Sequence, residues 1–589
     1  MSKTPTPRRL SRRGFLGRAG AAGGAMIAAP ATLTACGGDS GADPAVVGDE
    51  SYEPGSASLL VELGPEVEGI NYPEDYVGPK ARELEPFGDG ETEFSILGRT
   101  IPELDYATNY YAGLVEEKTG VKVKYQPVPL GDDGVTTVNA MLSGGELPHA
   151  LMTGMGLFSV SQVSVYGQQG MFLPLDKLID EHAPHVREMF ELFPDMRTLF
   201  TSPDGRMYAV PSMNDCFHCK SSNTRMWLNS AWFEEIGAEA PETLDEYTAV
   251  IDELKAWSKL PKNAGLTVAS SDTMMSMFNF FMGSFTEVGQ ENKLLRDGKV
   301  TWGPTEDAYR EGMIWIQEQF AKGRFSSSTL SMTTEQLQQM GDDPDGPRFA
   351  VVQGASQGSF ATTVDFSDPA NVASLMKPLA PMAGPGGVRT SAWDWYQIGS
   401  PNFVITTSCP DPVQMIRWAD YQFELGMTIS MGRGEKGKGW DYADTGAVGI
   451  DGEQAVYSVL PGGGDIPNQV WWEWGPFFKS MSQRHGEAVL DDSNSVEPSL
   501  YEAGKAYEPY RLDKELVVPP LAFDMEQSAV VGELETNLVQ HLEQSFAAAA
   551  SGKIDLTKDA DWQAYVDKFT AIGVDDLLNV YQEAYDAQF

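Results

Sequence analysis

A Cys-Phe-His-Cys run, residues 216–219, brings groups that could do chemistry together at short spacing. Two thiols three residues apart can form a disulfide, act as a redox pair, or bind a metal together with His218. Redox activity favours a helix beginning at the first cysteine, but residues 220–223 show no apolar helical stripe, and a zinc site favours a second Cys or His pair. We therefore predict a structural disulfide, Cys216–Cys219 or one of these with Cys409, with redox and metal binding as alternatives.

Two short runs contain five of the thirteen tryptophans, which makes these runs candidates for lining a ligand-binding site. A sugar has hydroxyls at its edge and C–H groups on its faces, so its site combines flat rings with polar side chains. Trp recurs at i and i+2, which places two rings on one face of an extended run. The alternative is that one face of each run lies in the core. The predicted ligand-binding residues are Trp393, Asp394 and Trp395 in one run, and Trp471, Trp472, Glu473 and Trp474 in the other.

Three further ligand-binding candidates stand where predicted strands end. Asn109 and Tyr110 open a helix after the first predicted strand, and Gln353 closes a strand before the polar loop 354–359. Ligands in open α/β sheets bind near the carboxyl ends of strands. Helix capping and core packing are equal alternatives for Asn109 and Tyr110.

Paired carboxylates would indicate a surface glycoside hydrolase or lyase instead. Such an enzyme needs two carboxylates about 5–10 Å apart across the bond that is cut. Asp394 and Glu473 could form this pair, but a chain with 84 acidic residues offers many other pairings. The His-Glu-x-x-His motif of zinc proteases is absent from the sequence. We therefore rank a binding protein without chemistry of its own above an enzyme.

The N-terminus carries the features of an export signal in the expected order. Residues 1–18 contain six basic residues and no acid, and the mildly apolar stretch 19–35 is too short for a comfortable membrane span. Ser11–Leu16 matches the twin-arginine pattern. Leu33-Thr34-Ala35-Cys36 resembles a lipobox, in which the Cys36 thiol takes a diacylglycerol. We predict removal of residues 1–35, and attachment of the exported chain to the outside of the cell membrane through Cys36.

The charge of the chain limits its partners. Removing residues 1–35 changes the formal net charge from −42 to −48. Such a surface argues against binding nucleic acid, mildly disfavours a polyanionic ligand, and leaves membrane attachment to the lipid. Residues 36–91 are acidic with scattered Pro and Gly, and we predict a flexible tether there. The roughly 500 residues beyond it exceed one hydrophobic core, so at least two lobes are expected.

The periodicity of the body indicates an α/β fold. Strands are predicted at 93–99, 121–125 and 150–152, with helices at 109–118 and 137–142 between them, which calls for a parallel sheet. A capping box, Thr243 to Glu246, opens another helix. The remaining predicted elements are helices at 306–321, 412–424 and 559–586 with a break at Gly573, and strands at 349–352 and 402–406.

A series of short segments, in order along residues 92–589, resembles the family 1 extracellular solute-binding proteins. The similarity is to the long carbohydrate-binding lipoproteins that include the alginate-binding receptors. Each segment alone is weak evidence for the family, but the occurrence of all of them in the family's order is specific to it. The segments are 141–148, 172–176, 205–211, 216–219, 226–229, 232–233, 243–247, 405–409, 417–421 and 581–586.

This resemblance implies a type II periplasmic-binding-protein-like fold, with two α/β lobes around a ligand cleft. It implies a monomeric receptor that captures a carbohydrate, with an oligosaccharide as the expected ligand, for an ABC permease, without a cofactor. Crossings between the lobes are predicted near Leu228, Val352 and Ser400. Lobe one is then residues 92–228 and 353–400, and lobe two is residues 229–352 and 401–589.

Two departures from the family's pattern bear on function. His149 stands where many relatives have an acidic residue. Residues 257–265 replace the EF-hand-like loop of this branch, and they offer lysines and no carboxylate. Calcium needs six to eight hard oxygens, so we predict no calcium there. A receptor for a peptide or another non-sugar solute stays open, because a fold does not dictate its ligand.

Overall fold

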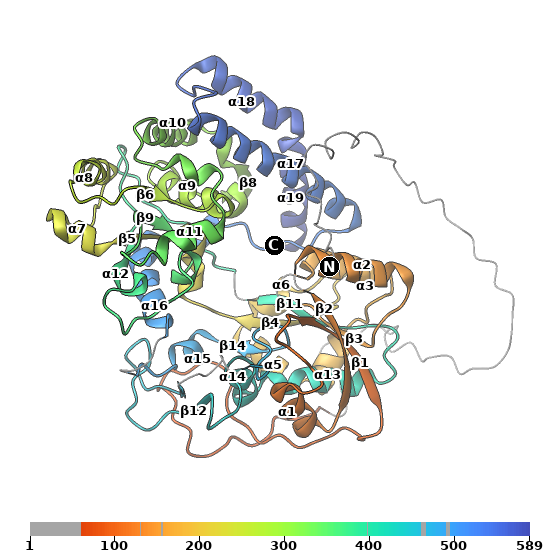
Figure 1. Cartoon of the computed structure of the whole chain (residues 1–589). Coiled ribbons are helices and arrows are strands. Elements are labelled where there is room, and N and C mark those ends of the chain that lie inside the picture. The colour runs from red at the N-terminus through yellow and green to blue at the C-terminus, as the bar shows by residue number, and fades with distance from the viewer. Residues whose placement is uncertain (1–59, 130, 155–156, 397–398, 461–466, 491–494) are drawn as a thin grey trace, which may run out of the picture. The chain divides into compact units, whose positions relative to one another are not determined.

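The computed structural model describes residues 60–129, 131–154, 157–396, 399–460, 467–490 and 495–589, shown as coloured ribbon in Figure 1. The predicted signal peptide and Cys36 lie outside the described residues, so export and lipidation remain predictions. Within the described ranges, every helix is too short or too polar to cross a membrane.

The first lobe is built on a six-stranded mixed sheet with the strand order β14-β4-β11-β3-β1-β2. β1 pairs in parallel with β2 and with β3, as the predicted strand–helix alternation requires. β11 runs antiparallel to both β3 and β4, so the sheet is mixed rather than wholly parallel. Its strands are β1 (Glu93–Thr100), β2 (Lys122–Pro129), β3 (Ala150–Met152), β4 (Val210–Asn214), β11 (Gly399–Ile405) and β14 (Phe478–Lys479).

Local signals in the sequence begin and end the helices of this lobe. Asn109 caps α1 by accepting the N–H of Ala112 at 3.0 Å, and Gly120 ends the helix with a φ of 71°. The helices are α1 (Tyr110–Thr119), α2 (Asp132–Gly144), α3 (Val160–Gln168), α4 (Asp176–His182), α5 (Pro184–Leu192), α6 (Asp195–Leu199), α13 (Pro412–Asp420), α14 (Leu425–Arg433) and α15 (Met481–His485). A two-stranded sheet, β12 (Trp440–Tyr442) with β13 (Tyr457–Val459), lies beside them.

The second lobe has a four-stranded sheet with the order β10-β5-β9-β6. Its strands are β5 (Met226–Asn229), β6 (Gly265–Val268), β9 (Phe349–Gln353) and β10 (Met376–Leu379). The predicted capping box is present, since Thr243 accepts the N–H of Glu246 at 3.2 Å while Glu246 accepts that of Thr243. A hairpin, β7 (Lys293–Arg296) with β8 (Lys299–Trp302), extends the lobe.

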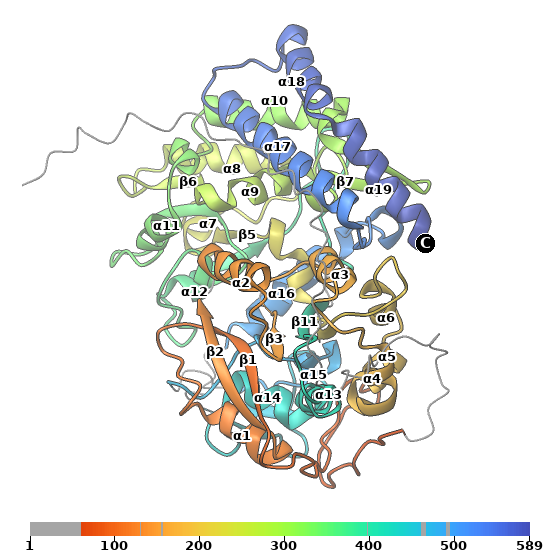
Figure 2. The same cartoon turned by 90° about the vertical axis from the view of Figure 1, so that its right-hand side faces the viewer.

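Helices from distant parts of the chain cover this second sheet. The chain's last three helices pack together, and α17 also contacts α10, as Figures 1 and 2 both show. Gly573 separates α18 from α19 with a φ of 113°, the predicted break. The helices are α7 (Ser230–Ile236), α8 (Leu244–Ala256), α9 (Met274–Met282), α10 (Asp307–Ala321), α11 (Thr334–Gly341), α12 (Val372–Leu375), α16 (Glu497–Tyr507), α17 (Met525–Ala550), α18 (Asp559–Ile572) and α19 (Val574–Gln588).

The lobe boundaries differ from those predicted. β10 pairs with β5 in the second sheet, which places residues 353–396 largely with the second lobe instead of the first. β11 and β14 belong to the first sheet, so residues 399–485 return to the first lobe. The chain passes between the lobes after β4, before β11 and after α15, and Val352 lies inside a strand of the second sheet. Strand partners so far apart in sequence leave no local signal, which explains the misplacement.

The described part of the predicted tether, residues 60–91, is packed against the first lobe; we call it the strap. Ala81 is buried in a cluster with Ile429 and Trp440, and Tyr72 and Tyr76 lie against the same cluster. The acidic composition suggested a chain without enough apolar surface to fold. The strap's aromatic residues, however, bury against a surface that the first lobe already provides.

The buried Glu424 carboxylate ties the strap to α14. It accepts the N–H of Arg82 at 3.1 Å and caps α14 by accepting the N–H of Met427 at 2.8 Å. We expect Glu424→Ala to lower the free energy of unfolding by about 1–3 kcal/mol, because both donors lose a charged acceptor. Urea unfolding measures this change. Glu66→Ala removes a half-exposed carboxylate that pairs with Lys80 at 3.1 Å and with Arg82 at 3.5 Å, and it should cost less than about 1 kcal/mol; an equal loss in both variants would contradict the assignment.

Candidate functional site

A pocket of about 440 Å³ lies beside the turn at residues 471–474. Its walls come from α14, Tyr457 of β13, this turn, residues 479–487 and the first residue of α16. α16 packs on β10 of the second sheet, so the pocket joins the first lobe to an element of the second. The volume lies within the range of small-molecule sites.

Trp471 anchors the turn and does not line the pocket. It is fully buried in the first-lobe core, where Tyr106, Tyr111, Tyr125 and Trp418 surround its indole ring at centroid distances of 4.8–6.3 Å. Its backbone N–H donates to the carbonyl of Met431 in α14 at 2.9 Å. The aromatic cage therefore fixes where the following residues emerge.

The backbone turns sharply at Trp472, so the predicted extended run is not present here. Trp472 has a φ of 54°, and the N–H of Trp474 donates to the carbonyl of Trp471 at 3.2 Å. The turn buries Trp471 and places the rings of Trp472 and Trp474 in the pocket lining. The centroids of these two rings are 4.9 Å apart, and their planes meet at 48°. Trp472 is 38% exposed and Trp474 is 3% exposed. The site thus has one open and one embedded indole wall.

Charged side chains of both signs form the rest of the wall. Glu473 pairs with Lys479 at 2.9 Å and accepts a hydrogen bond from the Asn214 amide at 3.2 Å. Arg433 pairs with Glu487 at 2.9 Å, and the Tyr457 hydroxyl donates to the same carboxylate at 3.1 Å. These groups offer donors and acceptors suited to hydroxyls, and ion pairing lowers the cost of burying their charges.

A third ion pair connects the pocket to the crossing after β4. Arg484 lies 3.1 Å from Glu497, the α16 residue of the lining, and donates to Oδ1, the side-chain amide oxygen, of Asn214 at 2.9 Å. Glu497 also lies 3.2 Å from Nε2 of His218. Burial lowers the pKa of His218 to about 4, more than Glu497 raises it, so the imidazole is neutral at pH 7.

Ion pairing keeps Glu473 ionised. Burial raises the pKa of this carboxyl, but the cations Lys479 and Arg484 outweigh burial and hold the pKa below its usual value. A general acid of a glycosidase needs the opposite shift. Glu473 is therefore suited to accept hydrogen bonds rather than to give a proton to a leaving group.

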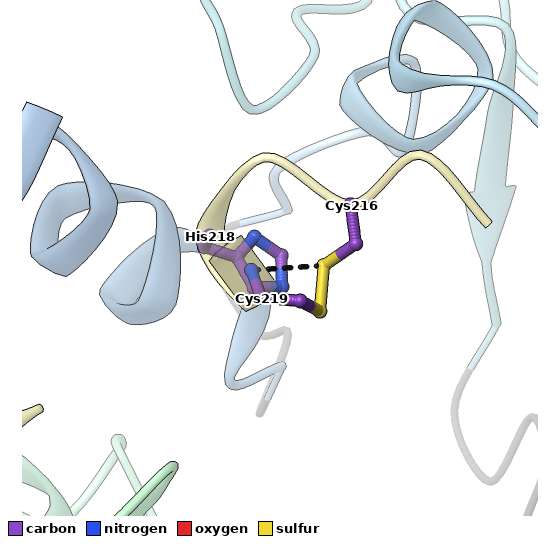
Figure 3. A group of neighbouring side chains, drawn as sticks. All are labelled: Cys216, His218 and Cys219. Carbon is purple, nitrogen blue, oxygen red and sulfur yellow. Dashed lines mark hydrogen bonds between the residues drawn. A yellow bond between two sulfur atoms is a disulfide. The ribbon is translucent and has the colours of Figure 1, made fainter. Parts of the chain in front are cut away.

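Cys216 and Cys219 are paired in a disulfide, which is one of the predicted pairings, and Figure 3 shows the bond with His218 beside it. Cys409 is a buried free thiol. Burial raises the pKa of the Cys409 thiol to about 12, so it is protonated at neutral pH. The disulfide lies in the crossing between β4 and β5.

The first tryptophan run lies in the second lobe and outside the pocket lining. Trp393 is 3% exposed and packs edge-on against Phe217, at 5.6 Å between centroids. Trp395 donates its indole N–H to the carbonyl of Leu512 at 2.8 Å. The Asp394 carboxylate accepts the N–H of Tyr396 at 3.0 Å. Trp393 is thus part of the second-lobe core, the alternative interpretation of this run, while Trp395 is only partly buried against that core.

The three strand-end candidates occupy other places. Asn109 is a helix cap whose amide donates to the carbonyl of Asn468 at 3.0 Å, and Tyr110 is half-buried against the first-lobe core. Asn109 also lines a wider groove of about 1000 Å³ beside β1 and β2. Gln353 ends β9 and is 3% exposed, and its buried Oε1 has no hydrogen-bond partner in the part of the chain described.

The structure therefore brings three of the ten predicted ligand-binding residues together in the pocket: Trp472, Glu473 and Trp474. It adds polar residues that sequence reasoning missed, since they come from separate helices, strands and a loop without a shared motif. Those whose contacts are described above are Arg433, Tyr457, Lys479, Arg484, Glu487 and Glu497. Spacing along the chain carries no signal that would have grouped them.

Comparisons with known proteins agree with this architecture. The family model for bacterial extracellular solute-binding proteins matches residues 114–414. The fructooligosaccharide ABC transporter substrate-binding protein FusA of Streptococcus pneumoniae serotype 4 is 22% identical over 496 residues, covering 80% of this chain and 86% of FusA. A structure of FusA in complex with kestose aligns with a TM-score of 0.68 at 19% identity, covering 84% of this chain and 99% of that one.

Two further solved structures share the fold. An extracellular solute-binding protein from Bifidobacterium longum subsp. infantis aligns with a TM-score of 0.71 at 16% identity, covering 85% of this chain and 99% of that one. The calcium-free alginate-binding protein AlgQ2 aligns with a TM-score of 0.63 at 19% identity, covering 86% of this chain and all of that one. The fold is therefore the type II solute-binding fold predicted from the sequence. With a family match across more than half of its length, the chain belongs to the bacterial extracellular solute-binding proteins.

Proposed function

We propose that this protein is an extracytoplasmic receptor that captures a carbohydrate, preferably an oligosaccharide, and delivers it to an ABC transporter permease. The observation that carries the proposal is the pair of indole rings, Trp472 and Trp474, lining a pocket with paired charged groups. Rings supply flat walls for the C–H faces of a sugar, and ionised side chains supply strong hydrogen bonds to its hydroxyls. The names of FusA and AlgQ2, which bind fructooligosaccharide and alginate, favour the same ligand class.

The location and delivery route belong to the same proposal. A twin-arginine signal at residues 1–35 and a lipid on Cys36 would hold a monomeric receptor outside the cell membrane. Closure of the two lobes around the ligand would present the complex to the permease. Mass spectrometry of the protein from its native membrane tests the anchor: a diacylglyceryl group on an N-terminal Cys36 supports it, and an unmodified N-terminus contradicts it.

Calorimetry with a panel of neutral and acidic oligosaccharides, including kestose, tests the ligand class. We expect one ligand per chain for at least one member of the panel. Absence of binding to every sugar together with tight binding of a peptide would support the non-sugar alternative instead. The test requires only the soluble chain beginning after Cys36, with Cys216 and Cys219 oxidised.

An enzyme is the second candidate, and the site favours it less. Gly354-Ala355-Ser356-Gln357-Gly358 follows β9 and matches Gly-x-Ser-x-Gly, which makes a serine hydrolase worth testing. Ser356 has an extended backbone (φ −148°, ψ 175°), and the chain enters a three-residue 3₁₀ helix instead of the strained turn of a nucleophile elbow. Asp394 lies outside the lining that holds Glu473. Turnover of labelled glycans that disappears in Asp394→Ala, or hydrolysis of an ester that disappears in Ser356→Ala, would overturn this ranking.

The charge of Glu473 should make sugar binding sensitive to acid. Its pKa in the folded protein is lower than the usual 4.5, so the carboxylate stays ionised from pH 7 down to about 4.5 and is lost only below that value. We expect affinity to hold across pH 7–5 and to fall below pH 4.5. Glu473→Gln should weaken binding about tenfold at pH 7. It should also reduce the fall in affinity below pH 4.5, which we call the acid limb. Calorimetry at pH 7, 5 and 4 measures this; an unchanged acid limb in Glu473→Gln would contradict the assignment.

A further inference from the structure

The Cys216–Cys219 motif brings three potential metal ligands of two kinds, thiol and imidazole, to one point. The two Sγ atoms and one ring nitrogen of His218 all lie within 4.8 Å of one another, and Figure 3 shows the imidazole next to the sulfur pair. The motif lies in the crossing segment and outside the lining of the Trp472–Trp474 pocket. It is therefore a second candidate site, which adjoins the proposed sugar site through Glu497, a residue of the pocket lining that contacts His218.

The backbone around the motif suits a thiolate pair. The N–H of Cys219 donates to Sγ of Cys216 at 3.2 Å. A donor at this position stabilises negative charge on the sulfur once the disulfide is opened. Cys216 is 1% exposed while Cys219 is half-buried, so the second cysteine is the less shielded of the two residues. This asymmetry suits attack by an external thiol at Cys219.

A carboxylate outside the motif orients the histidine. Glu497 lies 3.2 Å from Nε2 of His218, and the ring is 4% exposed. Metal-binding histidines commonly use one ring nitrogen for the metal and hold a carboxylate with the other. With Nε2 directed at Glu497, Nδ1 is the nitrogen left for a metal. The charge of Glu497 is also balanced by Arg484, so the carboxylate needs no metal to stay buried.

We propose that the reduced form of this motif binds one Zn²⁺ through the sulfurs of Cys216 and Cys219 and a ring nitrogen of His218. Two thiolates and an imidazole are ligands that zinc prefers, and the Cys-x₂-Cys spacing is that of many zinc sites. The described residues supply three ligands, so a water molecule completes the tetrahedron. The oxidised motif does not bind the ion, because thiolates and not disulfide sulfurs are the metal ligands.

Zinc binding requires that the disulfide first be reduced, and a dithiol can serve as the reductant. The dithiol passes two electrons and two protons to the Cys216–Cys219 bond, becomes a disulfide itself, and leaves two thiols on the protein. Zn²⁺ then displaces the two thiol protons and is bound by the two thiolates. Re-oxidation by an external disulfide reverses this step: the disulfide takes the two electrons of the thiolates and becomes a dithiol by taking up two protons from solvent, the Cys216–Cys219 bond re-forms, and Zn²⁺ is released because its two thiolate ligands are gone. The motif would thus hold metal only where reducing equivalents reach the protein.

Cobalt titration of the full chain after Cys36 tests this site, with Co²⁺ as a spectroscopic substitute for zinc. Protein reduced with a dithiol and freed of it under anaerobic conditions should bind one Co²⁺ with the near-ultraviolet absorption of cobalt–thiolate bonds. One equivalent of Zn²⁺ should abolish that absorption. Oxidised protein should show neither signal. Reduced wild-type protein that binds no Co²⁺ with thiolate absorption would overturn the proposal.

Variants distinguish Co²⁺ binding at the motif from binding at Cys409, and a lost ligand from a misfolded protein. Cys216→Ser and Cys219→Ser should each lose the thiolate signal, and His218→Gln should weaken binding by about tenfold or more. Cys409→Ser is the matched control, because it removes a buried thiol outside the motif and should bind Co²⁺ like the wild type. Circular dichroism of each variant checks that the fold is kept. Retention of the thiolate signal in folded Cys216→Ser would place the metal elsewhere and refute the assignment.

Discussion

Trp472→Ala is expected to lower sugar affinity by about 30–100-fold, which corresponds to about 2–3 kcal/mol. The ring of Trp472 is 38% exposed, lines the pocket and lies 4.9 Å from that of Trp474. Alanine removes one of two walls against which a pyranose or furanose face would stack. The fold should tolerate the change, because Trp471 and not Trp472 anchors the turn in the core. Calorimetry with the best ligand of the panel measures the effect.

Two further variants make this result specific. Trp472→Tyr keeps an aromatic wall and should recover most of the affinity. Trp257→Ala removes a half-buried indole that packs against Trp232 in the second lobe, 6.1 Å between centroids, and should leave affinity unchanged. Equal losses in Trp257→Ala and Trp472→Ala would indicate a general loss of folding. Wild-type affinity in Trp472→Ala would remove the pocket from the proposed function.

Asp420→Ala is expected to lower the free energy of unfolding by about 3–5 kcal/mol. Asp420 is fully buried at the end of α13, where it lies 2.7 Å from Nδ1 of His185 and accepts the N–H of Val186 at 2.9 Å. Alanine leaves two buried polar groups of α5 without an acceptor, which costs more than the pair contributes. Urea unfolding followed by tryptophan fluorescence measures the change.

An exposed ion pair supplies the control for Asp420. Asp559 is 95% exposed at the side chain and pairs with Arg310 at 2.8 Å. Asp559→Ala should therefore cost less than about 1 kcal/mol. A cost for Asp420→Ala no larger than that for Asp559→Ala would show that the His185–Asp420 contact contributes little.

The same pair gives stability a defined pH dependence. Burial alone would lower the pKa of His185, but the charge and hydrogen bond of Asp420 outweigh burial and raise it above the usual 6.5. A raised folded pKa means that the contribution is fully present below pH 6.5 and is lost as pH rises through the folded value. Wild-type stability should thus decline above pH 6.5, and Asp420→Ala should flatten that decline.

Features set by neighbouring residues could be predicted from the sequence. The Asn109 cap, the capping box at Thr243 and the break at Gly573 each depend on a few adjacent side chains, and all three are present. The fold class followed from the strand–helix alternation and the family resemblance. The 26-residue helix α17 was not predicted, although Asp524 and Gln527 form a capping box and leucines recur from Leu534 to Leu542. Glycine and polar residues within α17 weaken its apolar stripe.

Features set by distant partners could not be predicted. The pocket combines a turn at 471–474 with side chains from α14, α15 and α16, and no local pattern indicates that these segments meet. The period-two rule placed Trp471 beside the ligand, but a residue with a φ of 54° follows it and reverses the chain. The aromatic cage that holds Trp471 comes from β2, α1, α13 and the loop before α1. Only tertiary structure shows which indole of the run is buried.

The packing of the strap decides which half of the receptor is tied to the membrane. Its described contacts are with first-lobe residues such as Glu181, Glu424 and Ser482. A lipid on Cys36 would therefore pull on the first lobe alone. The second lobe, with its long carboxyl-terminal helices, would then be the lobe that moves relative to the membrane when the receptor closes.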